Sequence, residues 1–516
     1  MGQLDSSADC IIIGSGVGGL CCAGLLARYG FETVVCESHN IPGGAAHAFE
    51  YQGYHFDSGP SLHSGLSYSP SSNPLKQVLD ALDVDLPCYT YDTWGCCLPE
   101  GQFDTTVGAD SFCKTLAELR GTEAVEEWRQ LQDVMAPLKE AAIAIPPAAL
   151  RLDWGAIQTA GSFAPSLLKH LPAVMKLTGP FSQIMNGVVQ DSFIRNWLDL
   201  LCFLLSGLPA SGTSAAEMAF MFAEWYRPGV KLDYPVGGSG ALVDTLVTGL
   251  QKFGGELRLK AHVDEILVEG DRAVGVRLRG GETLRARKAV ISNASVWDTL
   301  KLMPQGSLPQ RFVTERSQTP ECDSFMHLHL GIDAVGLPAD LACHHIVVND
   351  WDAGVTAPQN VILISIPSVL DASLAPAGHH AIHVYTPGNE PYDLWAGLDR
   401  KSDAYARLKA ERSEVMWKGL ERVIPDVRDR LKVSLVGTPL THERFLRRHR
   451  GSYGPAISAG DGLFPGAKTP FPGLLCCGDS TFPGIGLPAV AASGMIAANT
   501  LAPVDQHRKM LRAIGY

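Results

Sequence analysis

Three glycines near the start of the chain have the spacing of a phosphate-binding turn. Gly14, Gly16 and Gly19 fill the pattern G-x-G-x-x-G. The first glycine allows a tight turn, the second lets the backbone approach a pyrophosphate, and the third lets a helix pack closely on a strand. The N-terminus of that helix also favours negative charge, because its backbone N–H groups are unpaired. These residues therefore predict a binding site for a dinucleotide.

The elements that must position these glycines follow one another in the expected order. An apolar strand is predicted over 10–13, a helix over 20–29 and a second strand over 33–36. Glu37 ends the second strand, where its carboxylate would accept hydrogen bonds from a ribose hydroxyl and repel a 2′-phosphate. The uncharged segment 10–27 is long enough to span a bilayer. Its five glycines nevertheless favour strand, turn and helix over a spanning helix.

Length and composition bound the class of protein. A chain of 516 residues exceeds one ordinary core, so two or more domains are expected, and 46% hydrophobic with 19% charged residues predicts large apolar interiors. The net charge of −12 argues against nucleic acid as a partner, because phosphate backbones are bound by clustered Lys and Arg. The 13 cysteines include no C-x-x-C pair, so they are interpreted as buried thiols in a reducing compartment rather than as a metal or redox site.

The N-terminus offers little room for a targeting segment. Only eight residues precede Asp9, so we expect either no presequence or one that is missing from this chain. Met1 and Gly2, followed by Ser6, fit the myristoylation pattern, which is short enough to arise by chance.

A second glycine pair follows the acidic residue, in the sequence I-P-G-G-A-A-H-A-F. Gly43 and Gly44 allow the chain to fold back over the dinucleotide, and a hairpin is predicted through Tyr54 and Phe56. With its glycine fingerprint, acid, P-G-G turn and F-D-S-G hairpin, the segment resembles the phytoene desaturase and carotenoid isomerase group of flavoproteins. The resemblance implies FAD as the cofactor. It also implies that the hairpin carries three polar residues toward the flavin: Asp57, Ser58 and His63.

The resemblance extends over most of the chain, roughly 9–65 and 234–494. In the family, the residue at Val263 contacts adenine through its backbone. The closing signature L-L-C-C-G-D-S-T-F-P-G-I-G-L-P implies further cofactor contacts at Gly478, Asp479, Gly486 and Leu487. The last two start a helix whose dipole stabilises negative charge on a reduced flavin. The motif G-S-Y-G-P at 451–455 is similar to an element of carotenoid isomerases, which places the chain nearer the prolycopene isomerase branch than the bacterial phytoene desaturases.

The family fold that this implies is α/β and has two parts. A discontinuous Rossmann-type FAD-binding domain, of the glutathione-reductase and amine-oxidase kind, is expected over 8–100, 232–300 and 470–503. A mixed α+β substrate domain is expected over 101–231 and 301–469. No second G-x-G-x-x-G unit follows an apolar strand, so we predict no nicotinamide domain. The enzyme would exchange electrons with a separate donor or acceptor such as a quinone, or it would need no electrons on balance.

The activity implied by the resemblance is cis–trans isomerisation of a long poly-cis carotene in a plastid, with FAD and no net redox change. Desaturation, saturation or hydration of a polyene stay open, because close relatives carry out all of these reactions. A non-catalytic flavin or carotenoid carrier is the alternative from another class. Glu224 and Asp57 are the candidates for proton transfer or charge stabilisation, and a structural salt bridge with Arg227 is the alternative for Glu224.

Histidine pairs invite a metal site, but their spacing lacks the pattern of one. They alternate on predicted strands or lie in loops without H-E-x-x-H, so we predict no metal at His327/His329, His344/His345 or His379/His380.

A proline-interrupted apolar region over 136–225 predicts broken helices, none long enough to span a bilayer. These form either a helical core or a peripheral membrane contact. For a contact, one helix face would carry Leu167, Leu168, Leu171, Val174 and Met175, with Lys169, His170 and Lys176 near headgroups.

Overall fold

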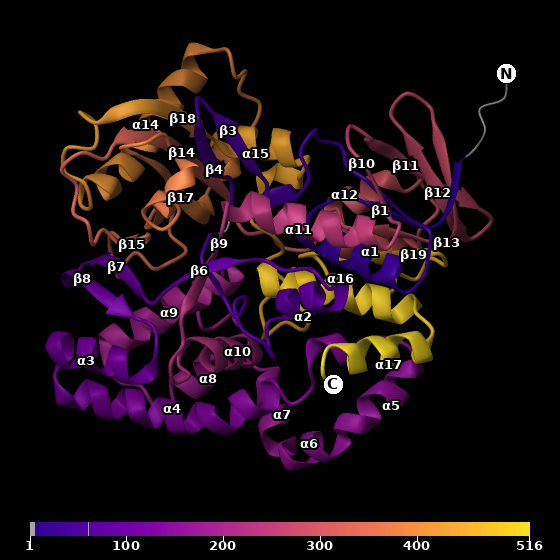
Figure 1. Ribbon diagram of the computed structural model, residues 1–516, viewed down its shortest axis with the longest axis horizontal. Helices are drawn as coiled ribbons and strands as arrows, with labels where there is room; N and C mark the ends of the chain where they lie inside the picture. Colours follow the sequence, from indigo (N-terminus) through magenta and orange to yellow (C-terminus); the bar gives the residue numbers. More distant parts are fainter. Residues whose placement is uncertain (1–5, 60) are drawn as a thin grey trace.

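The first of two seven-stranded sheets is assembled from strands that lie far apart in the sequence (Figure 1). In this computed structural model, which describes residues 6–59 and 61–516, the strand order is β10-β2-β1-β13-β12-β11, with β19 pairing β13. The strands are β1 (Ser6–Ile13), β2 (Thr33–Cys36), β10 (Glu256–Arg258), β11 (Val263–Glu269), β12 (Arg272–Leu278), β13 (Thr283–Ser292) and β19 (Leu474–Cys476). Because β1, β2, β13 and β19 are parallel, their carboxyl ends meet at one edge, where α/β folds bind ligands.

Helices cover this sheet and position the glycine turn. α1 (Val17–Arg28) connects β1 to β2, so the predicted strand, helix and strand are confirmed, with the helix beginning at Val17 rather than Leu20. α16 (Leu487–Leu501) crosses α1 closely, since a Cβ on Gly494 would lie 2.1 Å from the carbonyl oxygen of Gly18. Three further helices pack nearby: α2 (Pro74–Leu82), α11 (Gly238–Lys252) and α17 (Val504–Ala513).

The second sheet has the order β18-β14-β17-β16-β15-β7-β8. Its strands are β7 (Thr93–Leu98), β8 (Gly101–Thr106), β14 (Ser324–Asp333), β15 (His344–Val348), β16 (Val361–Ser365), β17 (His379–Glu390) and β18 (Leu431–Gly437). β7 lies within 8–100, which was expected to be part of the cofactor domain, yet it pairs with β15 of this second sheet. Around this sheet lie α14 (Asp403–Glu421) and α15 (Pro439–Leu446), whereas α12 (Val296–Leu302) and α13 (Gln310–Ser317) pack against the first sheet.

Two small sheets join the large ones. The hairpin predicted through Tyr54 and Phe56 is confirmed as β3 (Ala48–Tyr51) and β4 (Tyr54–Asp57). β9 (Leu232–Pro235) lies between β5 (His63–Ser64) and β6 (Cys88–Tyr91), antiparallel to both. The glycines at the start of α11 therefore follow an antiparallel strand and do not form a second parallel dinucleotide unit.

The region 109–225 folds as helices of 4 to 21 residues that lie below the two sheets in Figure 1. They are α3 (Ala109–Arg120), α4 (Thr122–Ala142), α5 (Gly155–Ala160), α6 (Ala164–Lys169), α7 (Leu171–Leu177), α8 (Ser182–Met185), α9 (Ser192–Ser206) and α10 (Ala215–Trp225). The prediction of broken helices is confirmed, but the single face expected over 167–175 is wrong. The chain breaks at His170 because Pro172 lacks an N–H and is favoured only in the first turn of a helix.

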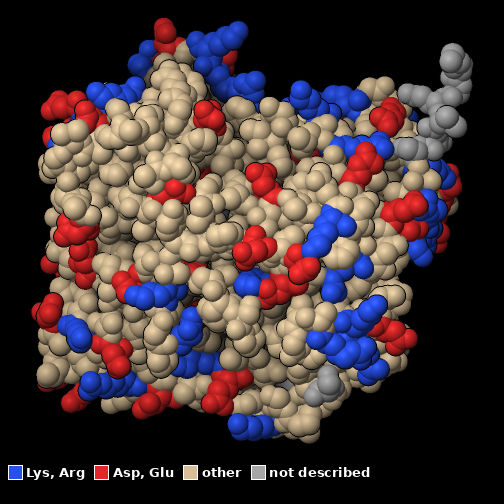
Figure 2. Space-filling model, in the orientation of Figure 1, with Lys and Arg blue, Asp and Glu red and all other residues tan. Residues whose placement is uncertain are grey.

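Charges of both signs are mixed on the face shown in Figure 2, without a large basic patch. Among the described helices, none combines the length and the apolar character that crossing a membrane requires. Met1 and Gly2 of the myristoylation pattern lie outside the described residues, as does the side chain of Leu167.

Candidate active site

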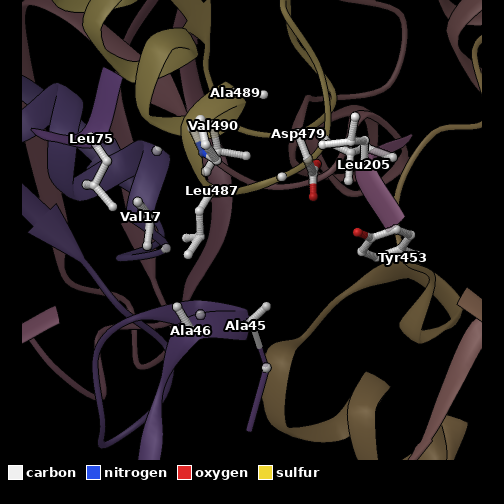
Figure 3. A pocket seen from close by; sticks show the side chains of 18 of the residues that line it. Val17, Ala45, Ala46, Leu75, Leu205, Tyr453, Asp479, Leu487, Ala489 and Val490 are labelled. Carbon is white, nitrogen blue, oxygen red and sulfur yellow. The ribbon is translucent and has the colours of Figure 1, made fainter. Parts of the chain in front are cut away.

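A cavity of about 980 Å³ lies where the two sheets and the helical layer meet. One end, here called the phosphate end, is lined by the glycine turn, Glu37, Val263 and Asp479. The other end, here called the apolar arm, is lined by side chains of α9, α10 and the second sheet: Leu201, Leu204, Leu205, Phe220, Met221, Trp225, Ile346 and Leu363. In Figure 3, Leu205 and Tyr453 lie beside Asp479, while Val17, Ala45 and Ala46 lie further along the cavity. The two ends belong to one continuous space.

The glycine turn leaves no room for side chains. Gly14 has a φ of +92°, and a Cβ on Gly16 would lie 2.7 Å from Nδ2 of Asn293. A Cβ on Gly19 would lie 2.3 Å from the carbonyl oxygen of Gly14, which explains the close packing of α1 on β1. A Cβ on Gly44 would lie 3.0 Å from the Cα of Gly16, so the two glycine loops touch. This cradle fits a pyrophosphate held against backbone.

Glu37 is held firmly at the end of β2. It is 8% exposed and lines the cavity. Its Oε2 accepts hydrogen bonds from the Ser15 amide, 2.8 Å away, and from the Ser15 hydroxyl, 2.6 Å away. Its Oε1 accepts from the His39 amide at 2.8 Å. The carboxylate is thus fixed beside the turn, with lone pairs left for a ribose hydroxyl.

The closing signature supplies the other wall of the phosphate end. Gly478 has a φ of +93°, and a Cβ there would lie 2.7 Å from Oδ1 of Asn293. Gly486 has a φ of +97° and precedes the first turn of α16, so the N-terminus of this helix opens on the cavity at Leu487 (Figure 3). Asp479 forms an ion pair with Arg448. A positive helix end and a paired carboxylate therefore lie side by side.

Two residues of this end were not assigned from the sequence. The side chain of Asn293 lies where a Cβ on Gly14, Gly16 or Gly478 would point. Asn293 directly follows β13. Its position at the carboxyl end of a parallel strand was the available signal. Arg448 gave none, because its contact with Asp479 arises only from tertiary folding.

Glu224 lies on α10 with its side chain buried in the cavity wall. Its carboxylate accepts a hydrogen bond from the Tyr68 hydroxyl at 2.8 Å and another from the Ser72 hydroxyl. Burial and this carboxylate raise the pKa of Tyr68 to about 12. The alternative salt bridge with Arg227 is not formed among the described residues, because the guanidinium lies over the Tyr68 ring, 4.2 Å from its centre.

Asp57 is not among the described residues that line the cavity. Its carboxylate accepts from the Tyr234 hydroxyl and from the Ser239 amide, both at 2.8 Å. Burial raises the pKa of Asp57. The structure therefore brings Glu224 to the cavity and places Asp57 behind its wall, where it ties the start of α11 to β4.

Three buried imidazoles cluster on the second sheet: those of His327, His329 and His383, with ring nitrogens within 4.8 Å of one another. The rings of His329 and His383 are stacked within 6° of parallel, and those of His327 and His383 within 18°. Nitrogen lone pairs lie in the ring planes, so the face-to-face rings of His329 and His383, with centres 4.4 Å apart, do not direct theirs at one point. The hydrogen bond of 2.9 Å between His327 and His383 uses two of these nitrogens. The arrangement suits a stacked polar cluster better than a cation.

Comparisons with known proteins agree with this geometry. The family described as "Flavin containing amine oxidoreductase" matches residues 17–502. The chain is 32% identical to "Prolycopene isomerase, chloroplastic" of Daucus carota, over 96% of this chain and 80% of that protein. It is 26% identical to "Phytoene desaturase (lycopene-forming)" of Pseudescherichia vulneris, over 95% and 98%. The solved structure of wild-type putrescine oxidase bound to putrescine superposes with a TM-score of 0.64 at 17% identity, over 96% and 98%, which shows the shared fold.

Proposed function

The chain belongs to the family of flavin containing amine oxidoreductases, within its carotenoid isomerase-like branch, and we propose that it isomerises cis double bonds of a poly-cis carotene. It is an FAD-dependent enzyme. The observation that carries the proposal is the continuity of the phosphate end with the apolar arm, because one cavity can then hold a dinucleotide and a long hydrocarbon in contact. We assign the cofactor to the first sheet (8–100, 232–300 and 470–503 in outline) and the polyene to the second sheet and the helical layer.

We assign the cofactor contacts as follows. The cradle formed by Gly14, Gly16, Gly44 and Asn293 holds the pyrophosphate, Glu37 holds the adenosine ribose, and the backbone of Val263 faces adenine. Gly43, Gly478 and Asp479 complete the wall, and the N-terminus opened by Gly486 and Leu487 stabilises negative charge on the bound group. FAD, when bound, supplies reversible electron exchange with a conjugated substrate.

The arm positions the polyene and excludes water. Apolar side chains from α9 and α10 remove the hydrocarbon from water, at about 25 cal/mol for each Å² buried. Glu224, held by Tyr68 and Ser72, is the proposed group for stabilising positive charge that develops on the substrate. Asp57 is assigned a positioning role, since its contacts hold α11 and not the cavity.

We further propose peripheral attachment to a plastid membrane through α5, α6 and α7. A long carotene is insoluble in water, so it must be collected from a bilayer. Large apolar side chains are exposed on these helices and at the residue before α5: Trp154 at 87%, Ile157 at 70%, Leu168 at 72%, Leu171 at 53% and Met175 at 77%. Val174 instead packs toward the core. Lys169 and Lys176 are exposed nearby, and Leu177 at the end of α7 lines the cavity.

Liposome flotation tests this surface. Replacing Leu168 and Leu171 with Asp is expected to release the protein from liposomes and lower turnover of membrane-embedded carotene, with FAD content unchanged. Asp in place of Val335, which is 75% exposed on the second sheet side, is the control and should leave flotation intact. Flotation of the double variant at the wild-type level would assign the contact elsewhere.

An anaerobic incubation tests the reaction. We expect the enzyme with reduced FAD to convert a poly-cis carotene to trans isomers of unchanged mass, over many turnovers without an added electron acceptor. The similarity to a phytoene desaturase makes desaturation the second candidate. That reaction would stop without a quinone or other acceptor and would lower the product mass by two hydrogens per step. A carrier would return the carotene unaltered.

A further inference from the structure

Four polar side chains line the cavity beside the apolar arm. Ser61, His63, His344 and Ser365 line the cavity and are between 1% and 6% exposed. We call them the polar end. His63 lies on β5 of the three-stranded sheet, Ser61 lies just before it, and His344 and Ser365 lie on the second sheet, whereas the glycine turn, Glu37 and Val263 lie on or directly after strands of the first sheet. A pure hydrocarbon makes no use of such groups, and burying them without partners is costly.

The polar end shares a sheet face with apolar side chains. His344 on β15 is directly opposite Ser365 on β16, and Ile346 is opposite Leu363 in the same register. Because side chains two residues apart in a strand point to the same face, Ile346 and Leu363 lie beside the polar pair. A ligand in the arm therefore passes from an apolar surface to a polar one.

Three of the four residues form a hydrogen-bonded chain. Tyr91 Oη lies 2.7 Å from Nδ1 of His344, Nε2 of His344 lies 3.1 Å from Oγ of Ser61, and Oγ of Ser61 lies 2.6 Å from Oγ of Ser365. Burial lowers the pKa of His344 to about 3, so its ring is neutral and one of its nitrogens donates while the other accepts. The chain therefore runs in one of two directions. From Tyr91 to Ser365 it leaves the Ser365 hydroxyl as a free donor, and from Ser365 to Tyr91 it leaves the Ser365 oxygen as a free acceptor.

His63 adds a buried polar atom that has no partner among the described residues. Its Nε2 is buried and has no hydrogen-bond partner in the described part of the chain. Burial lowers the pKa of His63 to about 4, so the ring is neutral at physiological pH. The hydrogen bonds of the polar end involve no Lys or Arg among the described residues. An anionic ligand group would therefore be buried without a countercharge, which disfavours carboxylates and phosphates.

We infer that the polar end recognises a neutral oxygen group, a hydroxyl or a carbonyl, on the polyene. This rests on the proposed isomerisation and makes an oxygen-bearing polyene, rather than a hydrocarbon carotene, its preferred substrate. The ligand oxygen forms a hydrogen bond with the Ser365 hydroxyl, as acceptor or donor according to the direction of the chain. It also pairs with Nε2 of His63: a ligand hydroxyl donates to this nitrogen when it is unprotonated, and a hydroxyl or carbonyl oxygen accepts from it when it carries the proton. The unpaired Nε2 of His63 is then satisfied, which a hydrocarbon end cannot do.

Equilibrium binding tests the inference independently of turnover. Quenching of tryptophan fluorescence would be titrated with a linear poly-cis carotene and with its monohydroxylated derivative, both in detergent micelles, on the FAD-loaded enzyme. We expect the hydroxylated polyene to bind at least about tenfold more tightly. Ser365→Ala should remove about tenfold of that preference without changing the affinity for the hydrocarbon, and His63→Phe should remove it as well. Met221→Leu, a change in the arm away from the polar end, should shift both affinities alike.

Three results separate the alternatives. Equal affinities for the two polyenes in the wild-type enzyme would overturn the inference even if both are isomerised. Loss of FAD from Ser365→Ala, measured by flavin absorbance, would assign the polar end to the cofactor and overturn it too. A preference that Ser365→Ala abolishes, in an enzyme that isomerises neither polyene, would uphold the binding site and count against the proposed reaction alone.

Discussion

The two ends of the cavity are built by different means. The phosphate end is made of backbone: Gly14, Gly16 and Gly44 bring main chain to within contact of one another, and no side chain fits between them. The apolar arm is made of side chains from α9, α10 and the second sheet, which meet only through tertiary packing. The first end therefore tolerates no added atom, whereas the second tolerates changes in shape that preserve volume. Cofactor binding and substrate choice should accordingly respond separately to mutation.

The largest expected effect comes from filling the backbone cradle. Gly16→Val places a branched side chain where even a Cβ would lie 2.7 Å from Nδ2 of Asn293. We expect the purified protein to contain no FAD, as measured by its flavin absorbance. Gly161→Val is the control, because the space around that Cβ is open. Retention of FAD by the Gly16 variant would show that the cofactor does not cross the turn.

A smaller loss is expected at the ribose. Glu37→Ala removes the carboxylate that the ribose would share with Ser15 and should weaken FAD retention by about 1–3 kcal/mol, the range for a charged hydrogen bond. Glu37→Gln keeps the shape and should fall between. Dissociation constants from titration of the apoprotein with FAD measure both. Wild-type affinity in the alanine variant would leave Glu37 with a structural role only.

The smallest effect is the acid sensitivity that His329, on β14 of the second sheet, contributes. Burial lowers the pKa of His329 to about 4, below the value of about 6.5 in an unfolded chain. Between these values the unfolded state binds the extra proton, so the stability that the neutral ring contributes is complete above pH 6.5 and lost as pH falls toward 4. His329→Gln should reduce the slope of unfolding free energy against pH by up to about 1.4 kcal/mol per pH unit in this window. An unchanged slope would contradict the buried neutral state.

The same division decides what could be predicted from the sequence. The cofactor-binding roles of Gly14, Gly16 and Glu37 could be predicted because the strands, turn and helix that position them follow one another directly in the sequence. Asn293 and Arg448 were not assigned, since their partners lie on other elements. The polar end was not predicted as a group, although His63 was expected near the flavin and His344 was considered in a histidine pair, because Ser365 and His344 face each other only through the register of β15 and β16. Pro172 was a local signal for the break between α6 and α7, but the prediction of a single helix face did not take it into account. The domain boundaries and the roles of Glu224 and Asp57 stay predictions.

The central claim, that one cavity holds cofactor and polyene in contact, is tested most directly by the flavin spectrum. A poly-cis carotene titrated anaerobically into the FAD-loaded enzyme should shift the flavin absorbance with a stoichiometry of about one, since binding removes water from beside the flavin. Leu205→Trp, which fills the arm next to Asp479 and Tyr453 (Figure 3), should abolish the shift while FAD content stays at the wild-type level. A flavin spectrum that does not change while the carotene binds would contradict the claim.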